Sequence, residues 1–160
     1  MSERDEAAVL RAQDHAHAEG HDYTKGSPHL RHDSLRLGIE ARLRRLVRDA
    51  VARTGACRVL EIGAGHGTFT RTLLDAGATV TVTEASRASA DHLLLEFACD
   101  DRVHVVHDES GEFLLDQAER WDLAVLISVV HHIPDYLAFF RGLQEVVAEG
   151  GAIFLSLIHI

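Results

Sequence analysis

Residues 59–70 read Val-Leu-Glu-Ile-Gly-Ala-Gly-His-Gly-Thr-Phe-Thr. The residues before Gly63 predict a strand, and a helix is predicted directly after Gly67. The glycines between them let the backbone turn tightly and approach a ligand with no Cβ in the way. The N-terminus of the following helix presents unpaired N–H groups to a carboxylate or a phosphate. This stretch therefore predicts a ligand-binding loop between a strand and a helix.

Outside this loop, short apolar segments alternate with helical segments. We expect strands at residues 58–62, 78–83, 103–106, 121–129 and 152–157. We expect helices at residues 68–74, 86–98 and 135–147, and a helix or turn near residues 112–118. Such alternation predicts an α/β fold, a Rossmann-like doubly wound parallel sheet with helices on both faces. Helix starts are expected at Ser86 and Asp135. Helix ends are expected at Gly77 and at Gly150-Gly151.

Residues 1–54 are expected to form a helical extension ahead of a sheet domain at residues 55–160. Apolar residues recur at helical spacing from residue 34 onward, whereas residues 20–33 contain two glycines and a proline and predict a loop. Histidines gather in this part of the chain, but His15 and His17 would face different sides of a helix. We therefore expect a polar segment there and no metal site.

A second acidic residue supports the glycine loop. The next predicted strand ends at Glu84, 17 residues after Gly67, where a carboxylate can accept both hydroxyl protons of a ribose. A dinucleotide fingerprint would require glycine at position 68, which is threonine here. Glu61 would repel a pyrophosphate and attract a sulfonium or an ammonium. These residues favour S-adenosylmethionine over NAD as the ligand, and a glycine turn that binds nothing remains the structural alternative.

The order acid-x-G-x-G-x-G resembles the first motif of the class I S-adenosylmethionine-dependent methyltransferases. Residues 121–136, Trp-Asp-Leu-Ala-Val-Leu-Ile-Ser-Val-Val-His-His-Ile-Pro-Asp-Tyr, resemble the fourth strand of that superfamily and the turn after it. The resemblance covers about residues 56–154 and implies a seven-strand sheet, with strands 1–5 present here and the C-terminal hairpin missing. Residues 155–160 also match the in-frame translation of a transposon-end sequencing adapter. We therefore expect these six residues to be artefactual.

The resemblance also implies a set of cofactor-binding residues at the ends of the strands. These are Glu61, Gly63, Ala64, Gly65, Gly67, Glu84, Ala85, Asp108, Ser128 and Val129. Glu61 and the glycine loop would line the methionine end of S-adenosylmethionine, and Glu84 would hold the ribose. Asp108 would lie near the adenine amino group, with Ala85 beside the ring. Ser128 and Val129 would form the floor beside the transferred methyl group.

Three residues are candidates for catalysis. His131 and His132 follow the predicted fourth strand at the rim of the expected cleft, and an imidazole is a plausible general base for a hydroxyl or amine acceptor. Alternatively, either ring shapes the turn through a hydrogen bond to the backbone. Segments ahead of the first strand often form a lid in this superfamily, so Tyr23 could also reach the cleft, as could Lys25 and His29.

Charge and hydropathy exclude several classes of function. The 160 residues carry a net charge of −9, which disfavours binding to the phosphate backbone of a nucleic acid. The longest apolar run, residues 123–130, is far shorter than the ~20 residues that span a bilayer. We expect a cytoplasmic methyltransferase acting on an oxygen or nitrogen atom of a small molecule, with no nucleic-acid or membrane partner. The alternatives are an NAD(P)-linked oxidoreductase and a non-catalytic module of the same fold.

Overall fold

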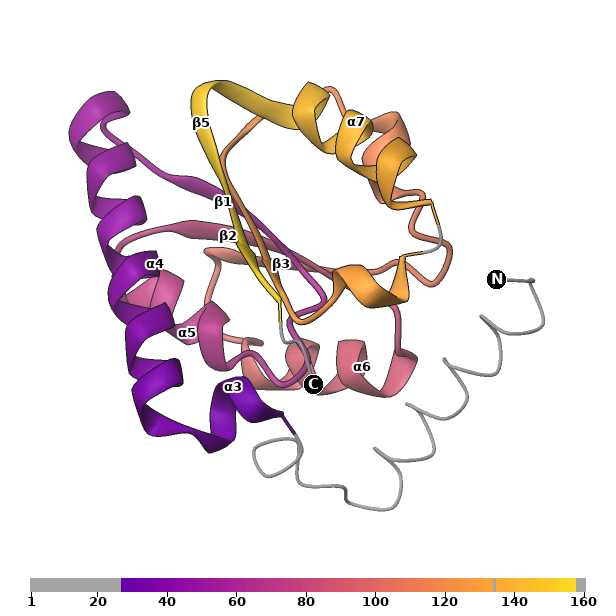
Figure 1. The fold of residues 1–160 in the computed structure, drawn as a ribbon, viewed down its shortest axis with the longest axis horizontal. Helices are drawn as coiled ribbons and strands as arrows, with labels where there is room; N and C mark the ends of the chain where they lie inside the picture. Colours follow the sequence, from indigo (N-terminus) through magenta and orange to yellow (C-terminus); the bar gives the residue numbers. More distant parts are fainter. Residues whose placement is uncertain (1–26, 134, 158–160) are drawn as a thin grey trace.

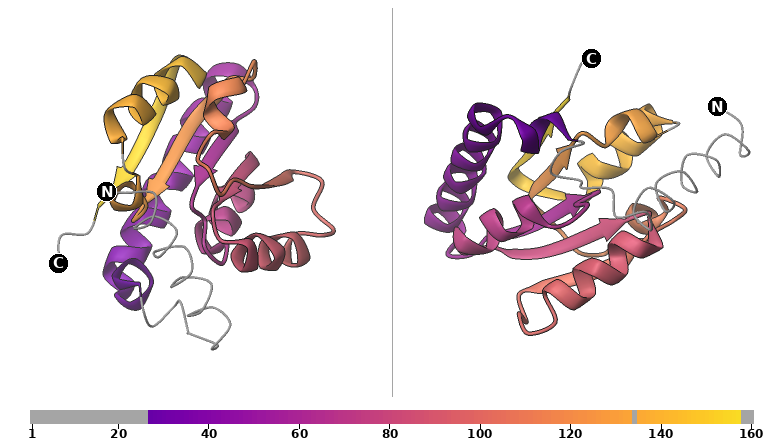
Figure 2. Two further views of the ribbon diagram at one scale, coloured as in Figure 1. Left: turned by 90° about the vertical axis from the view of Figure 1, so that its right-hand side faces the viewer. Right: turned by 90° about the horizontal axis from the view of Figure 1, so that it is seen from below.

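In the part of the chain that the structure describes, five parallel strands form one sheet in the order β3-β2-β1-β4-β5 (Figure 1). The computed structural model describes residues 27–133 and 135–157. The strands are β1 (Arg58–Ile62), β2 (Thr79–Glu84), β3 (Val103–His107), β4 (Trp121–Ile127) and β5 (Val147–Ser156). All neighbouring strands pair in parallel, and in Figure 2 their arrows point toward the same end of the sheet. The predicted parallel α/β fold is therefore confirmed.

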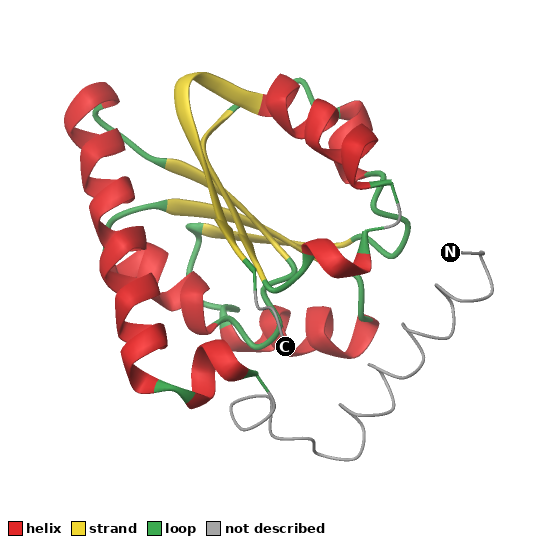
Figure 3. Ribbon diagram, viewed as in Figure 1, coloured by secondary structure: helices red, strands yellow, loops and turns green. Residues whose placement is uncertain are grey.

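Helices cover both faces of this sheet (Figure 3). They are α3 (Pro28–Arg31), α4 (Asp33–Thr54), α5 (Thr68–Asp75), α6 (Arg87–Glu96) and α7 (Tyr136–Val146), with short 3-10 turns η1 (Phe113–Asp116) and η2 (Val130–His132). In Figure 1, α4, α5 and α6 lie on one side of the strands and α7 lies on the other. In the described part of the chain, no helix is long and apolar enough to cross a membrane.

Each face of the sheet has its own apolar core, because successive residues of a strand point to opposite sides. On one face, Leu43 of α4 and Leu73 of α5 are fully buried in the same cluster as Val59 of β1. On the other face, Leu143 of α7 is buried in a cluster with Leu60, the next residue of β1. α4 lies within the predicted N-terminal extension and shares the core of the sheet.

The predicted helix boundaries are confirmed at three positions. The side chain of Ser86 accepts a hydrogen bond from the backbone N–H of Ser89 at the start of α6. Asp135 accepts one from the N–H of Ala138, at 2.9 Å, at the start of α7. Gly77 follows the end of α5 with a φ of 98°. Side-chain caps of this kind satisfy N–H groups that a helix start leaves unpaired.

The prediction that Gly150-Gly151 ends a helix is wrong. α7 ends at Val146, and both glycines lie inside β5, where the pairing register shifts opposite Trp121 and Leu123. A Cβ on Gly151 would lie 2.9 Å from the carbonyl oxygen of Asp122, so the backbone of β4 approaches too closely for a side chain. Glycine therefore permits a bulge in this strand, and it does not cap a helix here.

Two further boundaries differ from the prediction. Residues 28–31 form a helical turn inside the predicted loop, because proline is well tolerated at the first position of a helix, where no N–H partner is required. β4 ends at Ile127, two residues earlier than predicted, because Ser128 adopts a left-handed φ of 58° that leaves the extended conformation. The chain turns there into η2, which carries the histidine pair.

Candidate functional site

The glycine loop lies at the carboxyl end of β1, between β1 and α5. The φ angles of Gly63, Gly65 and Gly67 are 70°, 57° and 76°. The N–H of Gly63 donates to the carbonyl oxygen of Thr83 at the end of β2, at 2.8 Å. A Cβ on Gly63 would lie 2.7 Å from a methyl carbon of Val129, which follows β4. The loop therefore joins the ends of β1, β2 and β4, and the close approach to Val129 requires glycine at position 63.

Replacing Gly63 by alanine is expected to destabilise the protein by about 3 kcal/mol, because the variant combines a left-handed backbone with overpacking against Val129. Gly142 offers the matched control, since it lies inside α7 and no heavy atom lies within 4 Å of the position that a Cβ would occupy there. Gly142→Ala should raise the free energy of unfolding by about 0.5–1 kcal/mol. Urea unfolding of both variants checks this contrast, and equal stabilities would contradict it.

Glu61 lies in β1, two residues before the loop, and its side chain is almost completely buried. The residue is 3% exposed, and the Thr70 hydroxyl donates a 2.6 Å hydrogen bond to its Oε2. Burial raises the pKa of the Glu61 carboxyl from 4.5 to about 7. The hydrogen bond from Thr70 acts in the opposite direction, and the charge of Glu84 raises this pKa further. A buried carboxylate of this kind is stabilised by any cation that enters the site.

Glu84 ends β2 and holds two loops together. Its Oε2 accepts from the N–H of Gly65 and its Oε1 from the N–H of Ser86, both at 3.0 Å. The residue is 8% exposed, and burial raises the pKa of its carboxyl despite hydrogen bonds from Ser86, Gly65 and Ala85 that lower it. A carboxylate has about four lone-pair positions, so three N–H donors leave capacity for a further donor.

His107 ends β3 opposite Glu84, and Asp108 follows it. The N–H of Asp108 donates to the carbonyl oxygen of Glu84, which places Asp108 next to the turn after β2. The Asp108 carboxylate, however, accepts from the N–H groups of Glu112 and Phe113 in its own loop. His107 Nε2 lies 3.2 Å from the carbonyl oxygen of Ala85. Asp108 thus orders its own loop, and His107 is the side chain that contacts the turn carrying Ala85.

The histidine pair lies in η2, directly after β4. The ring centroids of His131 and His132 are 3.9 Å apart, and both residues are exposed. Desolvation lowers the pKa of His132, and the neighbouring His131 lowers it further. His132 is therefore largely neutral near pH 7, as a proton acceptor must be. Ser128 and Val129 connect this turn to β4, so the pair lies at the same edge of the sheet as the glycine loop.

Tyr23, which was predicted to belong to a lid, lies outside the described residues, as does Lys25. His29, the third residue of that predicted segment, lies in α3 and is 1% exposed. Its Nε2 is 2.9 Å from the hydroxyl of Ser156 at the end of β5, and burial lowers its pKa. α3 therefore lies against the carboxyl end of β5.

Sequence reasoning missed two contributions to this edge. Thr70 was visible in the quoted stretch, but only the fold shows that its hydroxyl reaches Glu61, nine residues away. The contact of His107 with the Ala85 carbonyl could not be predicted, because the sequence does not show which backbone group lies next to a polar residue at the end of a strand. Helical spacing from the start of α5 places Thr70 on the buried side of the helix. This spacing could have predicted that Thr70 lies near β1.

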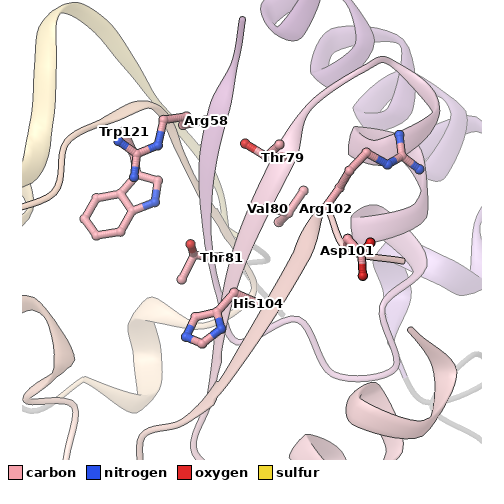
Figure 4. A pocket seen from close by; sticks show the side chains of 8 residues that line it. All are labelled: Arg58, Thr79, Val80, Thr81, Asp101, Arg102, His104 and Trp121. Atoms are coloured by element: carbon pink, nitrogen blue, oxygen red, sulfur yellow. The ribbon is translucent and has the colours of Figure 1, made fainter. Parts of the chain in front are cut away.

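A shallow hollow at the opposite edge of the sheet provides a contrast (Figure 4). It is lined by Arg58, Thr79, Val80, Thr81, Asp101, Arg102, His104 and Trp121, most of them at the amino ends of the strands. Its two cationic side chains are already paired, because Arg58 bonds Glu119 and Arg102 bonds Asp100. The buried carboxylates and the glycine loop lie at the other edge, which is the edge where open parallel sheets bind ligands.

The arrangement of Glu61, Glu84 and the glycine loop suits a ligand that carries both positive charge and hydroxyl groups. A cation is stabilised by the buried Glu61 carboxylate, and hydroxyl groups can donate to the free lone pairs of Glu84. A diphosphate at the glycine loop would instead meet the buried Glu61 carboxyl group, which repels it once it is ionised. The residues present therefore fit a sulfonium nucleoside better than a dinucleotide.

Comparison with known proteins agrees with this geometry. A family model described as a methyltransferase domain matches residues 35–159. The ubiquinone biosynthesis O-methyltransferase of Aromatoleum aromaticum is 29% identical over 103 residues, which cover 64% of this chain and 44% of that protein. Its counterpart in Xanthomonas campestris pv. campestris (strain B100) is 31% identical over 114 residues, covering 68% of this chain and 46% of that protein. The chain thus spans less than half the length of these curated relatives.

Solved structures share the fold. DhpI, in its complex with SAH, superposes with a TM-score of 0.71 at 21% identity, over 96% of this chain and 69% of that chain. The N-methyltransferase NodS from Bradyrhizobium japonicum WM9, in complex with S-adenosyl-L-homocysteine, superposes with a TM-score of 0.60 at 20% identity, over 79% and 61% of the two chains. At these identities the likeness shows the fold alone.

Proposed function

Because the chain belongs to the methyltransferase-domain family, whose model matches residues 35–159, we propose that it binds S-adenosylmethionine at the carboxyl edge of the sheet. It transfers the methyl group to an oxygen or nitrogen atom of a small-molecule acceptor. The observation that carries this proposal is the pair of buried carboxyl groups, Glu61 and Glu84, on either side of the glycine loop. The names of the relatives, O-methyltransferases and N-methyltransferases, support the choice of acceptor atoms.

Each end of the proposed cofactor has a matching group on the protein. Glu61 and the loop residues Gly63, Ala64, Gly65 and Gly67 hold the positively charged methionine end. Glu84 accepts the ribose hydroxyl groups, Ala85 flanks the adenine, and Asp108 lies near the adenine amino group. Ser128 and Val129 form the floor beside the methyl group, and the close approach of Val129 to Gly63 supports this role. The juxtaposition of these residues at one edge of the sheet supports these roles.

Bound S-adenosylmethionine supplies an electrophilic methyl group on a sulfonium. The protein's own contribution is to hold the acceptor in line with that methyl group and to exclude water, which together provide much of the acceleration. His131 or His132 accepts the proton that the acceptor's hydroxyl or amine loses. His132 suits this role because its lowered pKa leaves the ring neutral near pH 7.

Transfer of a radiolabelled methyl group from S-adenosylmethionine to a panel of catechols and primary amines tests this function. Labelled product supports it and identifies the acceptor atom. Binding of S-adenosylmethionine without transfer to any acceptor would favour a non-catalytic module of the same fold. Binding of NADH in place of S-adenosylmethionine would favour an oxidoreductase.

Replacing His132 by asparagine is expected to lower kcat about a hundredfold, in the range typical of a lost general base, with the dissociation constant for S-adenosylmethionine unchanged within about twofold. The wild-type rate should fall as the pH drops below the pKa of His132, and this limb should disappear in the variant. The same measurements on His131→Asn distinguish the two rings, because loss of the acidic limb in that variant would make His131 the proton acceptor. An unchanged kcat together with a lower melting temperature would assign His132 to the structure of the turn.

A further inference from the structure

The side chain of Thr70 is completely buried, and its hydroxyl contacts the Glu61 carboxylate of the proposed cofactor site. It lies in the first turn of α5 and is 0% exposed. Its hydroxyl donates to Glu61 Oε2 at 2.6 Å, a length typical of a hydrogen bond to an ionised carboxylate. Since Glu61 lies nine residues earlier, on β1, this bond also fixes the carboxylate relative to the helix that follows the glycine loop.

Besides burial, two neighbouring groups shift the pKa of the Glu61 carboxyl. The hydroxyl of Thr70 favours the ionised form, and the carboxylate of Glu84, on the adjacent strand, disfavours it. Among the residues that the structure describes, Glu84 is the charged group that acts on this carboxyl. Thr70 is therefore the polar side chain that counters both the desolvation of Glu61 and its repulsion by Glu84.

We propose that Thr70 is a positioning residue of the cofactor site, whose hydroxyl holds the Glu61 carboxylate ionised and oriented toward a positively charged ligand. The proposal rests on the proposed function, because the ligand is the sulfonium cofactor. A protonated Glu61 attracts no cation, so entry of the cofactor requires the carboxyl to be ionised or to release its proton. Thr70 thus sets the pH above which the site accepts its cofactor.

The test compares Thr70→Val with Thr70→Ser and with Thr72→Val. Valine keeps the shape of threonine and removes the donor, whereas serine keeps the donor. Thr72 is the matched control because it is buried in the same helix, at 4% exposed, and its hydroxyl donates to the carbonyl oxygen of Thr68. Thr72→Val therefore reports the general cost of losing a buried hydroxyl from α5.

Calorimetric titration with S-adenosylmethionine between pH 6 and 8.5 provides the first readout. We expect Thr70→Val to weaken binding about fivefold at pH 7, which corresponds to a rise of about one unit in the pKa of Glu61. The difference should grow toward pH 6 and fall below about twofold near pH 8.5, where the carboxyl is mostly ionised in both proteins. Thr70→Ser and Thr72→Val should bind within twofold of wild type at every pH.

NMR titration of the Glu61 carboxyl carbon in the ligand-free protein provides the second readout. Its midpoint should rise in Thr70→Val and stay unchanged in Thr72→Val. An unchanged midpoint, or a loss of affinity in Thr70→Val that is the same at every pH, would overturn the proposal. If the wild type bound neither S-adenosylmethionine nor its demethylated product, the proposed function would fail, while the midpoints would still decide whether Thr70 controls Glu61.

Discussion

Replacing Glu61 by glutamine should stabilise the ligand-free protein at pH 8 and remove most of its affinity for S-adenosylmethionine. Burial raises the pKa of this carboxyl from 4.5 to about 7, so an unfolded chain loses the proton more readily than the folded protein does. As the pH rises from 4.5 to 7, ionisation therefore lowers the stability of the folded state. A shift of this size corresponds to about 3 kcal/mol above pH 7. Glutamine carries no charge and escapes this cost.

Urea unfolding at pH 5 and pH 8 measures this effect. Glu61→Gln and wild type should have similar stability at pH 5, and the variant should be the more stable protein at pH 8 by as much as about 3 kcal/mol. Its affinity for S-adenosylmethionine should fall about a hundredfold, because a buried cation loses its charged partner. Lower stability of the variant at pH 8 would show that the Glu61 carboxylate is a structural group, and that it does not serve a ligand.

Replacing Glu84 by glutamine should weaken cofactor binding and release one of the two loops that this side chain holds. Its two oxygens accept separate N–H groups, from Gly65 and from Ser86. Glutamine offers one oxygen and turns an NH2 group toward the other donor, which leaves that donor without an acceptor. Affinity should fall about tenfold for each ribose hydroxyl that loses a charged acceptor.

Hydrogen exchange separates this effect from a general loss of stability. The amide of Gly65 or that of Ser86 should exchange faster in Glu84→Gln, while amides in the centre of β1 stay protected. The melting temperature is a poor readout, because the lost acceptor and the relieved buried charge act on it in opposite directions. Unchanged exchange at both amides, together with unchanged affinity, would contradict the role of Glu84.

Local sequence rules were sufficient to predict the strands and the helix that carry the site. The strand before Gly63 and the helix after Gly67 were predictable, because the hydrophobic pattern changes period at the glycines. The place of Glu84 at the end of β2 followed from the same reasoning. In a parallel sheet, the carboxyl ends of neighbouring strands meet at one edge, so these residues had to lie close together once the strand order was known.

Long-range contacts explain what the sequence could not show. Gly150-Gly151 resembles a helix end, but the pairing of β5 with β4 shows that both glycines lie in a strand. The sequence places Asp108 near the adenine but does not show that its oxygens also accept from the N–H groups of the loop that follows. The bond between Thr70 and Glu61 depends on how α5 packs on β1. Such pairings are set by tertiary packing, which residue spacing alone does not specify.

Isothermal titration calorimetry of the unmodified chain with S-adenosylmethionine and with NADH tests the central claim most directly. We predict one-to-one binding of S-adenosylmethionine that weakens as the pH falls below 7, and no heat with NADH. Binding of NADH, or the absence of heat with both S-adenosylmethionine and its demethylated product, would contradict the account.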